Sequence, residues 1–142
     1  MCDMCNGMTR EQVNAKTNRH IQEYGRSIVY VEADATSGSY GYTVGLSKVG
    51  HPEFLVRGMG PEDTMQMLNG FSESVLSRGE KFGQGHTANW KDGSLLFFST
   101  VSGRLHLLIP AAYSRYAQRT RLLEISFVGE DVPYSVLAAR KN

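Results

Sequence analysis

The sequence predicts an α+β fold, with a mainly antiparallel sheet of about five or six strands and two or three helices packed on it. Two observations lead to this class. Short runs rich in β-branched and aromatic residues alternate with turn-forming glycine and proline, and two longer stretches repeat apolar residues at helical spacing. The chain has 142 residues, of which 41% are hydrophobic, enough for one core. We therefore expect a single domain over residues 1–142.

The N-terminal part predicts one helix followed by a hairpin. Thr9 and Gln12 have the spacing of a capping box, apolar residues follow at helical intervals, and Gly25 offers a stop. Residues 27–34 and 40–46 then form two predicted strands around the turn-forming segment "ATSG".

The middle of the chain predicts a strand, a helix and a long loop. Residues 53–58 form a third strand, and Pro61 opens a helix that Gly79 can end. Residues 81–93, "KFGQGHTANWKDG", are rich in glycine and polar residues, which predicts a long loop or an irregular strand. Long ordered loops often carry function.

The C-terminal part predicts a second hairpin, a short helix and a last strand. Ser102 and Gly103 suit a tight turn between the strands "SLLFFSTV" and "RLHLLI". Pro110 introduces the helix, and residues 122–128 form the last strand. Beyond that strand the sequence predicts no defined element.

Composition excludes several function classes. The net charge of +1 is too small for the positive field that nonspecific nucleic-acid binding uses. No run approaches the roughly 20 apolar residues that span a bilayer, so we expect a soluble, cytoplasmic protein without a membrane partner. No dinucleotide-binding or Walker-type glycine loop, nucleophile elbow or His-Glu-x-x-His helix occurs, which disfavours the corresponding enzymes.

Both cysteines lie in the N-terminal segment, as Cys2 and Cys5. This spacing lets two thiolates bind one metal ion, zinc or iron, but structural zinc needs four ligands, so histidines or a second copy of the chain would complete the set. A redox pair is the second interpretation, and it needs a thiolate near a helix start. The third is that residues 1–8 form a mobile or packed tip. All three stay open.

The segment "GHPE" offers the first candidate site residues. His51 and Glu53 are two residues apart, and alternate positions of a strand face the same way, so the two side chains can share a ligand. The alternative is a structural turn in which His51 caps backbone groups and Glu53 pairs with a base such as Arg57 or Lys48.

The glycine-rich loop offers the second group of candidates. His86 and Asn89 lie beside Trp90, where polar groups and an aromatic ring can line a pocket, although a lone tryptophan is often a core anchor. The complete predicted ligand- or partner-binding set is Tyr42, His51, Glu53, Arg57, His86, Asn89 and Trp90, and no catalytic residue is predicted.

The blocks "YTVGL" at residues 42–46 and "GHPE" at residues 50–53 occur with an N-terminal Cys-x-x-Cys and a helix after the third strand. This combination resembles the domain-of-unknown-function family 4262, found in bacteria and their phages. Members of that family tend to end in a Trp-Pro-Asp-like segment, which "ISFVGEDVPY" resembles with Phe127 at the tryptophan position. The family has no established reaction, so the resemblance implies a shared fold and a candidate surface.

These observations favour a noncatalytic binding or accessory protein that engages a protein partner or a small molecule. One alternative is a small metalloprotein that uses Cys2 and Cys5 with histidine. The other is a flavin-linked oxidoreductase, which rests on a loose analogy of fold alone. An exposed strand at the edge of a small sheet also makes a homodimer a reasonable expectation.

Overall fold

The structure is a computed structural model, and it describes residues 7, 9–35 and 38–128. Its centre is a six-stranded sheet in the order β1-β2-β3-β6-β5-β4. All neighbouring strands are antiparallel except β3 and β6, which are parallel. The strands are β1 (Ser27–Val31), β2 (Tyr40–Val44), β3 (Glu53–Arg57), β4 (Thr87–Asn89), β5 (Leu95–Val101) and β6 (Leu122–Phe127). The predicted α+β class is confirmed.

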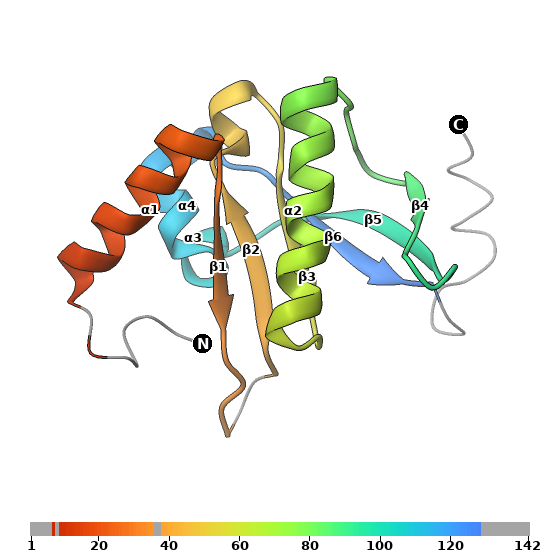
Figure 1. Cartoon of the computed structure of the whole chain (residues 1–142), viewed down its shortest axis with the longest axis horizontal. Coiled ribbons are helices and arrows are strands. Elements are labelled where there is room, and N and C mark those ends of the chain that lie inside the picture. Colours follow the sequence, from red (N-terminus) through yellow and green to blue (C-terminus); the bar gives the residue numbers. More distant parts are fainter. Residues whose placement is uncertain (1–6, 8, 36–37, 129–142) are drawn as a thin grey trace.

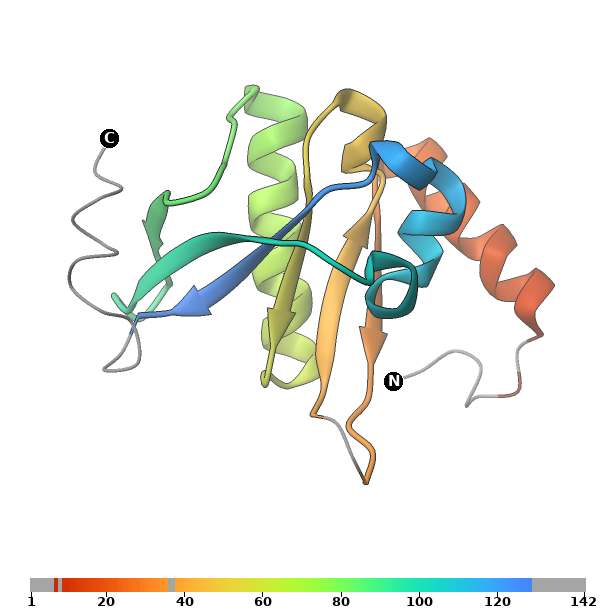
Figure 2. The ribbon, with the colours of Figure 1, turned by 180° about the vertical axis from the view of Figure 1, so that it is seen from behind.

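Helices cover both faces of the sheet (Figures 1 and 2). The long α2 lies across one face, the short α3 and α4 lie on the other, and α1 runs beside the edge strand β1. The helices are α1 (Arg10–Tyr24), α2 (Pro61–Arg78), α3 (Leu105–Leu108) and α4 (Pro110–Tyr116), with 3-10 turns η2 (Leu46–Val49) and η3 (Ala117–Arg119). No helix in the described part of the chain is long and apolar enough to cross a membrane.

The ends of α1 follow the local sequence signals. Thr9 and Gln12 form a reciprocal capping box, in which the Gln12 N–H donates to Thr9 Oγ1 at 3.1 Å and the Thr9 N–H donates to Gln12 Oε1 at 2.9 Å. Gly25 ends the helix in the left-handed conformation. Pro61 and Gly79 mark the two ends of α2 in the same way.

Each face of the sheet carries its own apolar cluster. Because neighbouring residues of a strand point to opposite faces, Phe54 and Val56 of β3 join one cluster and Leu55 joins the other. The α2 cluster contains Leu46, Phe54, Val56, Met67, Leu68, Val75, Leu96, Phe98, Leu123 and Ile125. The α4 cluster contains Tyr42, Val44, Leu55, Ile109, Ala112 and Leu122.

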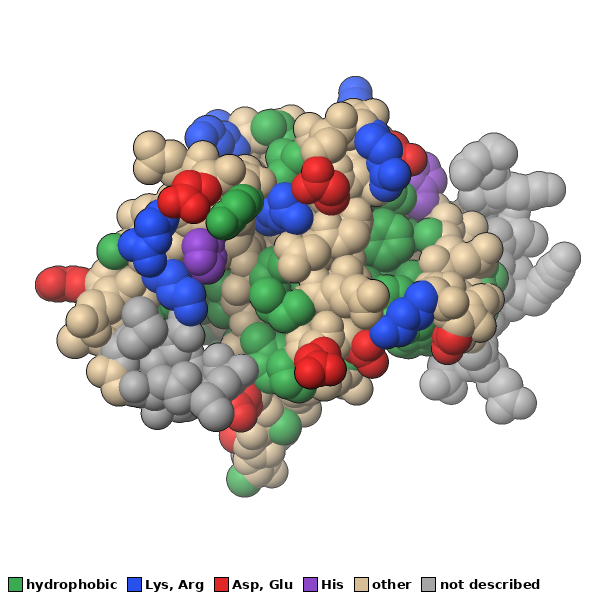
Figure 3. All heavy atoms as spheres, viewed as in Figure 1, with side chains coloured by type: hydrophobic (Ala, Val, Ile, Leu, Met, Phe, Trp, Pro, Cys, Tyr) green, Lys and Arg blue, Asp and Glu red, His purple; other side chains and the backbone are tan. Residues whose placement is uncertain are grey.

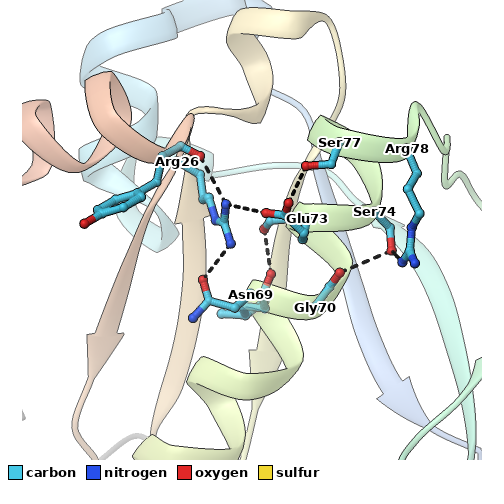
Figure 4. A network of polar contacts seen from close by, with 10 residues as sticks. Arg26, Asn69, Gly70, Glu73, Ser74, Ser77 and Arg78 are labelled. Carbon is cyan, nitrogen blue, oxygen red and sulfur yellow. Dashed lines mark hydrogen bonds and ion pairs between the residues drawn. The ribbon is translucent and has the colours of Figure 1, made fainter.

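A polar network joins the start of β1 to α2 (Figure 4). The Arg26 guanidinium donates to Glu73 Oε1 at 2.9 Å and to Asn69 Oδ1 at 3.2 Å, both on α2. It also donates to the Tyr24 carbonyl at 3.1 Å. Since Arg26 lies between α1 and β1, these contacts fix the α1–β1 connection against α2.

The predicted strand at residues 104–109 is wrong, because α3 occupies this segment. The strand β5 ends at Val101, where it pairs with Leu122, and the chain then turns at Gly103 with φ of 106°. Leu105, Leu108 and Ile109 also have helical spacing, and all three pack into or against the α4 cluster. In the region predicted as a loop or irregular strand, residues 87–89 form the short β4.

Candidate functional site

A buried carboxylate organises one end of the sheet. Glu53, the first residue of β3, is 0% exposed, and its side chain accepts five hydrogen bonds from the end of β2 and the turn that follows it. Oε1 accepts from Thr43 Oγ1 at 2.7 Å and from the Leu46 N–H at 3.1 Å. Oε2 accepts from the Ser47 hydroxyl and N–H at 2.7 and 2.9 Å, and from the Gly45 N–H at 3.2 Å. Five donors and no acceptor match an ionised carboxylate.

The environment of Glu53 acts on its pKa in two directions. Burial raises the pKa of the Glu53 carboxyl, and hydrogen bonds from Ser47, Thr43 and Gly45 oppose that rise. The predicted alternative pairing with Arg57 is wrong, because the Arg57 Nε instead donates to Glu124 Oε2 at 3.0 Å. Glu53 therefore joins the "YTVGL" and "GHPE" blocks into one structural unit.

Gly45 is required where this unit meets the start of β1. Its φ is 134°, which side chains rarely adopt. A Cβ at this position would lie 2.5 Å from the Gly25 carbonyl oxygen and 2.9 Å from Arg26 Cα. The glycine thus lets the turn after β2 approach the end of α1 closely.

His51 connects the same unit to the loop after α2. Its ring is buried, with Nδ1 at 2.7 Å from the Pro52 carbonyl oxygen, and its Nε2 lies 3.0 Å from the Phe82 N–H. Because the Phe82 N–H can only donate, Nε2 accepts and Nδ1 carries the proton. Burial lowers the pKa of His51, the bond to Pro52 opposes this, and the charge of Arg121 lowers it further. The neutral ring therefore links the "GHPE" turn to the loop after α2 through hydrogen bonds.

A second histidine holds the same loop from the other side. His86 Nδ1 accepts the Gly83 N–H at 3.0 Å. The Phe82 ring contacts both imidazoles edge to face, with ring centroids 6.2 Å from each, and stacks on Phe98 at 5.0 Å. Phe82 thereby attaches the loop to the α2 cluster.

The loop after α2, which contains Phe82 and Gly83, forms one wall of a cavity of about 730 Å³ at this end of the sheet. The surrounding elements are the turn after η2, the end of α2, the end of β5 and the start of β6 (Figure 2). Apolar lining residues include Pro52, Val75, Phe82, Val101 and Leu122, and the charged ones are Glu80, Lys81 and Arg121. The cavity is therefore apolar inside, with charges contributed by exposed residues.

Two residues just before β6, Thr120 and Arg121, also line the cavity. Thr120 is only 6% exposed, and its hydroxyl is the one buried side-chain polar atom without a hydrogen-bond partner in the described part of the chain. Arg121 is exposed, and its Nη2 donates to the Gly50 carbonyl at 2.6 Å. The guanidinium is thus held against the "GHPE" turn.

A larger groove of about 990 Å³ lies between α1 and α2, over β1. Figure 3 shows hydrophobic side chains gathered there. Its polar groups include Arg26, bonded to Glu73 and Asn69, and His20, whose Nδ1 lies 3.3 Å from Ser27 Oγ. The smaller cavity is the stronger candidate, because the "GHPE" turn and the loop after α2 line it.

The structure brings together three of the seven predicted site residues. His51 lines the cavity, Glu53 holds the turn beneath it, and His86 braces its loop. Lys81 and Phe82 fall within the loop that the sequence marked as functional. Thr120 and Arg121 were missed, because a threonine and an arginine at the start of a strand carry no recognisable motif.

The other four predicted residues lie elsewhere. Tyr42 is buried in the α4 cluster, its hydroxyl accepts the Ala111 N–H at 3.2 Å, and burial raises its pKa to about 12. Arg57 is at the opposite end of β3. Asn89 is exposed at the end of β4, and Trp90 packs against the α2 cluster.

The predicted metal ligands Cys2 and Cys5 lie outside the described residues, so that prediction stays open. Within residues 7, 9–35 and 38–128, no group of three or more histidine, cysteine, aspartate and glutamate side chains is placed to hold a metal ion.

Comparison with known proteins identifies a family. The model of a family described as "Domain of unknown function (DUF4262)" matches residues 20–128, which include all six strands and the cavity. No curated protein and no solved structure matches the chain.

Proposed function

The chain belongs to the domain-of-unknown-function family 4262, and we propose that it is a noncatalytic protein that binds a small molecule in the cavity at the end of the sheet. One observation carries this proposal: the "GHPE" turn and the loop after α2 enclose a mostly apolar cavity at the end of the sheet.

The size and lining of the cavity support a small molecule as the occupant. Its volume of about 730 Å³ falls in the range of ligand pockets, which are mostly apolar with a few polar groups. The family motifs lie around it, since the "GHPE" turn forms one wall and Glu53 anchors that turn. This arrangement gives the two motifs a shared role in shaping a binding site.

The bonding of the two titratable groups supports binding rather than catalysis. A general acid or base must face the substrate with an atom free to transfer a proton. All five hydrogen bonds to Glu53 come from the protein, and both ring nitrogens of His51 are engaged by backbone groups. These side chains are structural supports for the cavity.

Titration with a neutral apolar fluorophore, N-phenyl-1-naphthylamine, tests the proposal. Gly83 lines the cavity, its backbone is outside the left-handed region, and an added Cβ would meet no atom within 4 Å. Leucine in Gly83→Leu would therefore occupy cavity space without a backbone clash. The wild-type protein should bind the probe saturably with one site, and Gly83→Leu should bind it at least tenfold more weakly.

Gly70→Leu is the matched control, because Gly70 is an exposed α2 residue that also has open space around an added Cβ and does not line the cavity. It should bind the probe like the wild type. Equal binding by Gly83→Leu and Gly70→Leu, with both folded by circular dichroism, would contradict the proposal. Nonsaturable binding to the wild-type protein would also contradict it.

A further inference from the structure

We propose that the ligand of this cavity is a monocarboxylate with an apolar body, its carboxylate held by Arg121 and Lys81. The inference rests on the proposed function, since it names the chemical class of the molecule that the cavity takes. It is carried by the charges at the cavity, the geometry of Arg121 and the apolar wall.

The charges of the lining residues favour an anionic ligand. Lys81 and Arg121 are exposed cavity residues, and neither forms an ion pair within the described part of the chain. The third charged lining residue, Glu80, has its Oε1 at 3.8 Å from the Arg78 guanidinium. Lys81 and Arg121 are therefore the charged lining residues that remain to pair with an anion.

Arg121 is positioned to recognise a carboxylate. A guanidinium has five N–H donors in a planar fork that pairs with both oxygens of a carboxylate. The bond from Nη2 to the Gly50 carbonyl is the only hydrogen bond of the Arg121 guanidinium among the described residues, so further donors remain for a ligand.

Apart from its charged residues, the cavity lining is largely apolar. Val75, Phe82 and Val101 supply an apolar wall for the rest of the molecule.

A neutral apolar ligand fits these features less well. It would form no hydrogen bond with Lys81 or Arg121, whereas a carboxylate forms charge-assisted hydrogen bonds with such groups. A phosphate monoester is the competing anionic class, because a guanidinium pairs with phosphate as well as with carboxylate oxygens. Both classes are nevertheless outcomes of the test.

The test uses the full-length protein and four probes that share one ten-carbon chain: decanoate, 1-decanol, decylamine and decyl phosphate. Each is titrated below its micelle-forming concentration at pH 7.5, and displacement of N-phenyl-1-naphthylamine is measured. Decanoate should displace the fluorophore at a concentration at least tenfold lower than decanol or decylamine.

Two substitutions assign the effect to the cavity. Arg121→Gln should weaken decanoate binding about tenfold and leave decanol binding unchanged. Arg119→Gln is the matched control, because Arg119 is an exposed neighbour in η3 that lies over the Tyr116 ring and does not line the cavity. It should bind all four probes like the wild type.

Each contrary outcome has a distinct meaning. Equal displacement by decanoate and decanol overturns the carboxylate inference and leaves the proposed cavity binding intact. Tighter binding of decyl phosphate than of decanoate overturns the monocarboxylate in favour of a phosphate monoester. An equal loss in Arg119→Gln and Arg121→Gln overturns the assignment to Arg121. Absence of fluorophore binding to the wild-type protein counts against the proposed function itself.

Discussion

Glu53 is the residue on which the geometry of the site depends. Its two oxygens receive every hydrogen bond from a segment of five residues, and no positively charged side chain shares the carboxylate within the described chain. A buried charge of this kind is tolerated because backbone and hydroxyl dipoles replace its hydration. The turn after β2 and the first residue of β3 are consequently fixed relative to each other.

Glu53→Gln should lower the free energy of unfolding by about 3 kcal/mol. The amide has nearly the same shape, but its NH₂ group would face hydrogen-bond donors such as the Ser47 and Gly45 N–H groups. Urea denaturation at pH 7 measures the change. The matched control is Glu124→Gln, which breaks the partly exposed pair with Arg57 and should cost less than about 1 kcal/mol. Equal losses in the two variants would show that Glu53 is not the anchor of the turn.

The hydrogen bond that His51 accepts from the Phe82 N–H predicts a loss of stability in mild acid. Burial lowers the pKa of His51 below the ordinary value of 6.5 in the folded protein. The unfolded chain therefore binds the proton first, so the stabilisation is fully present above pH 6.5 and is lost as the pH falls from there toward the folded pKa. A proton on Nε2 would face the Phe82 N–H and break that hydrogen bond.

The measurement compares urea unfolding at pH 7.5 and pH 5.5 in the wild type and in His51→Gln. The drop in unfolding free energy should be larger in the wild type, because the variant lacks the titrating ring. Carboxyl groups titrate in both proteins, so their contribution cancels in the comparison. A drop of the same size in both would rule out His51 as the source.

Sequence patterns found part of the site at the residue scale. His51, Glu53 and His86 were identified because histidine and glutamate beside glycine and proline are chemically conspicuous. Their detailed roles required the fold, since the donors to Glu53 come from the preceding strand and turn, and the acceptor for the Phe82 N–H lies 31 residues earlier in the chain. The position of Arg121 beside the "GHPE" turn also required the fold, since its partner Gly50 lies 71 residues earlier in the chain.

At the scale of elements, local signals predicted helix ends better than strand identity. Caps at Thr9, Gly25 and Gly79 act through neighbouring backbone groups, so they can be recognised from short sequence stretches. The segment at residues 104–109 alternates in a way that fits a strand, but the same leucines also have helical spacing. Contact of these residues with the α4 cluster favours the helix α3 over a strand. Such contacts between distant parts of the chain cannot be read from short sequence patterns.

The close packing of α2 on β2 depends on Gly41. A Cβ at this position would overlap Thr64 Cγ2 and lie 3.3 Å from Leu68 Cδ1, so the helix would have to move. Gly41→Ala should therefore lower the free energy of unfolding by about 1–3 kcal/mol, the usual range for overpacking.

Gly70→Ala is the control for this prediction. An added Cβ at Gly70 meets no atom within 4 Å, and alanine is favoured over glycine within a helix, so this variant should be more stable by about 0.5–1 kcal/mol. Urea denaturation gives both values. A Gly41→Ala protein as stable as the wild type would show that α2 can shift without loss of packing.

For the molecule as a whole, the sheet couples two apolar clusters that lie on its opposite faces. The strands β3 and β6 each contribute to both, with Leu123 and Ile125 in the α2 cluster and Leu122 in the α4 cluster. Unpairing either strand would expose both clusters at once. We therefore predict that the two clusters unfold together, in agreement with the single domain expected from the length of the chain.

Matched Ile→Val substitutions, one in each cluster, test this coupling. Ile125 and Ile109 are both almost completely buried, at 1% and 0% exposure, so Ile125→Val and Ile109→Val should each lower the free energy of unfolding by about 1 kcal/mol. Trp90, the single tryptophan, packs against the α2 cluster and reports on it by fluorescence, while far-ultraviolet circular dichroism reports on all helices and strands. If the two clusters unfold together, Ile109→Val will shift the unfolding midpoint seen by Trp90 fluorescence as much as the midpoint seen by circular dichroism. If the Trp90 midpoint stayed at its wild-type value in Ile109→Val, the two faces of the sheet would unfold independently.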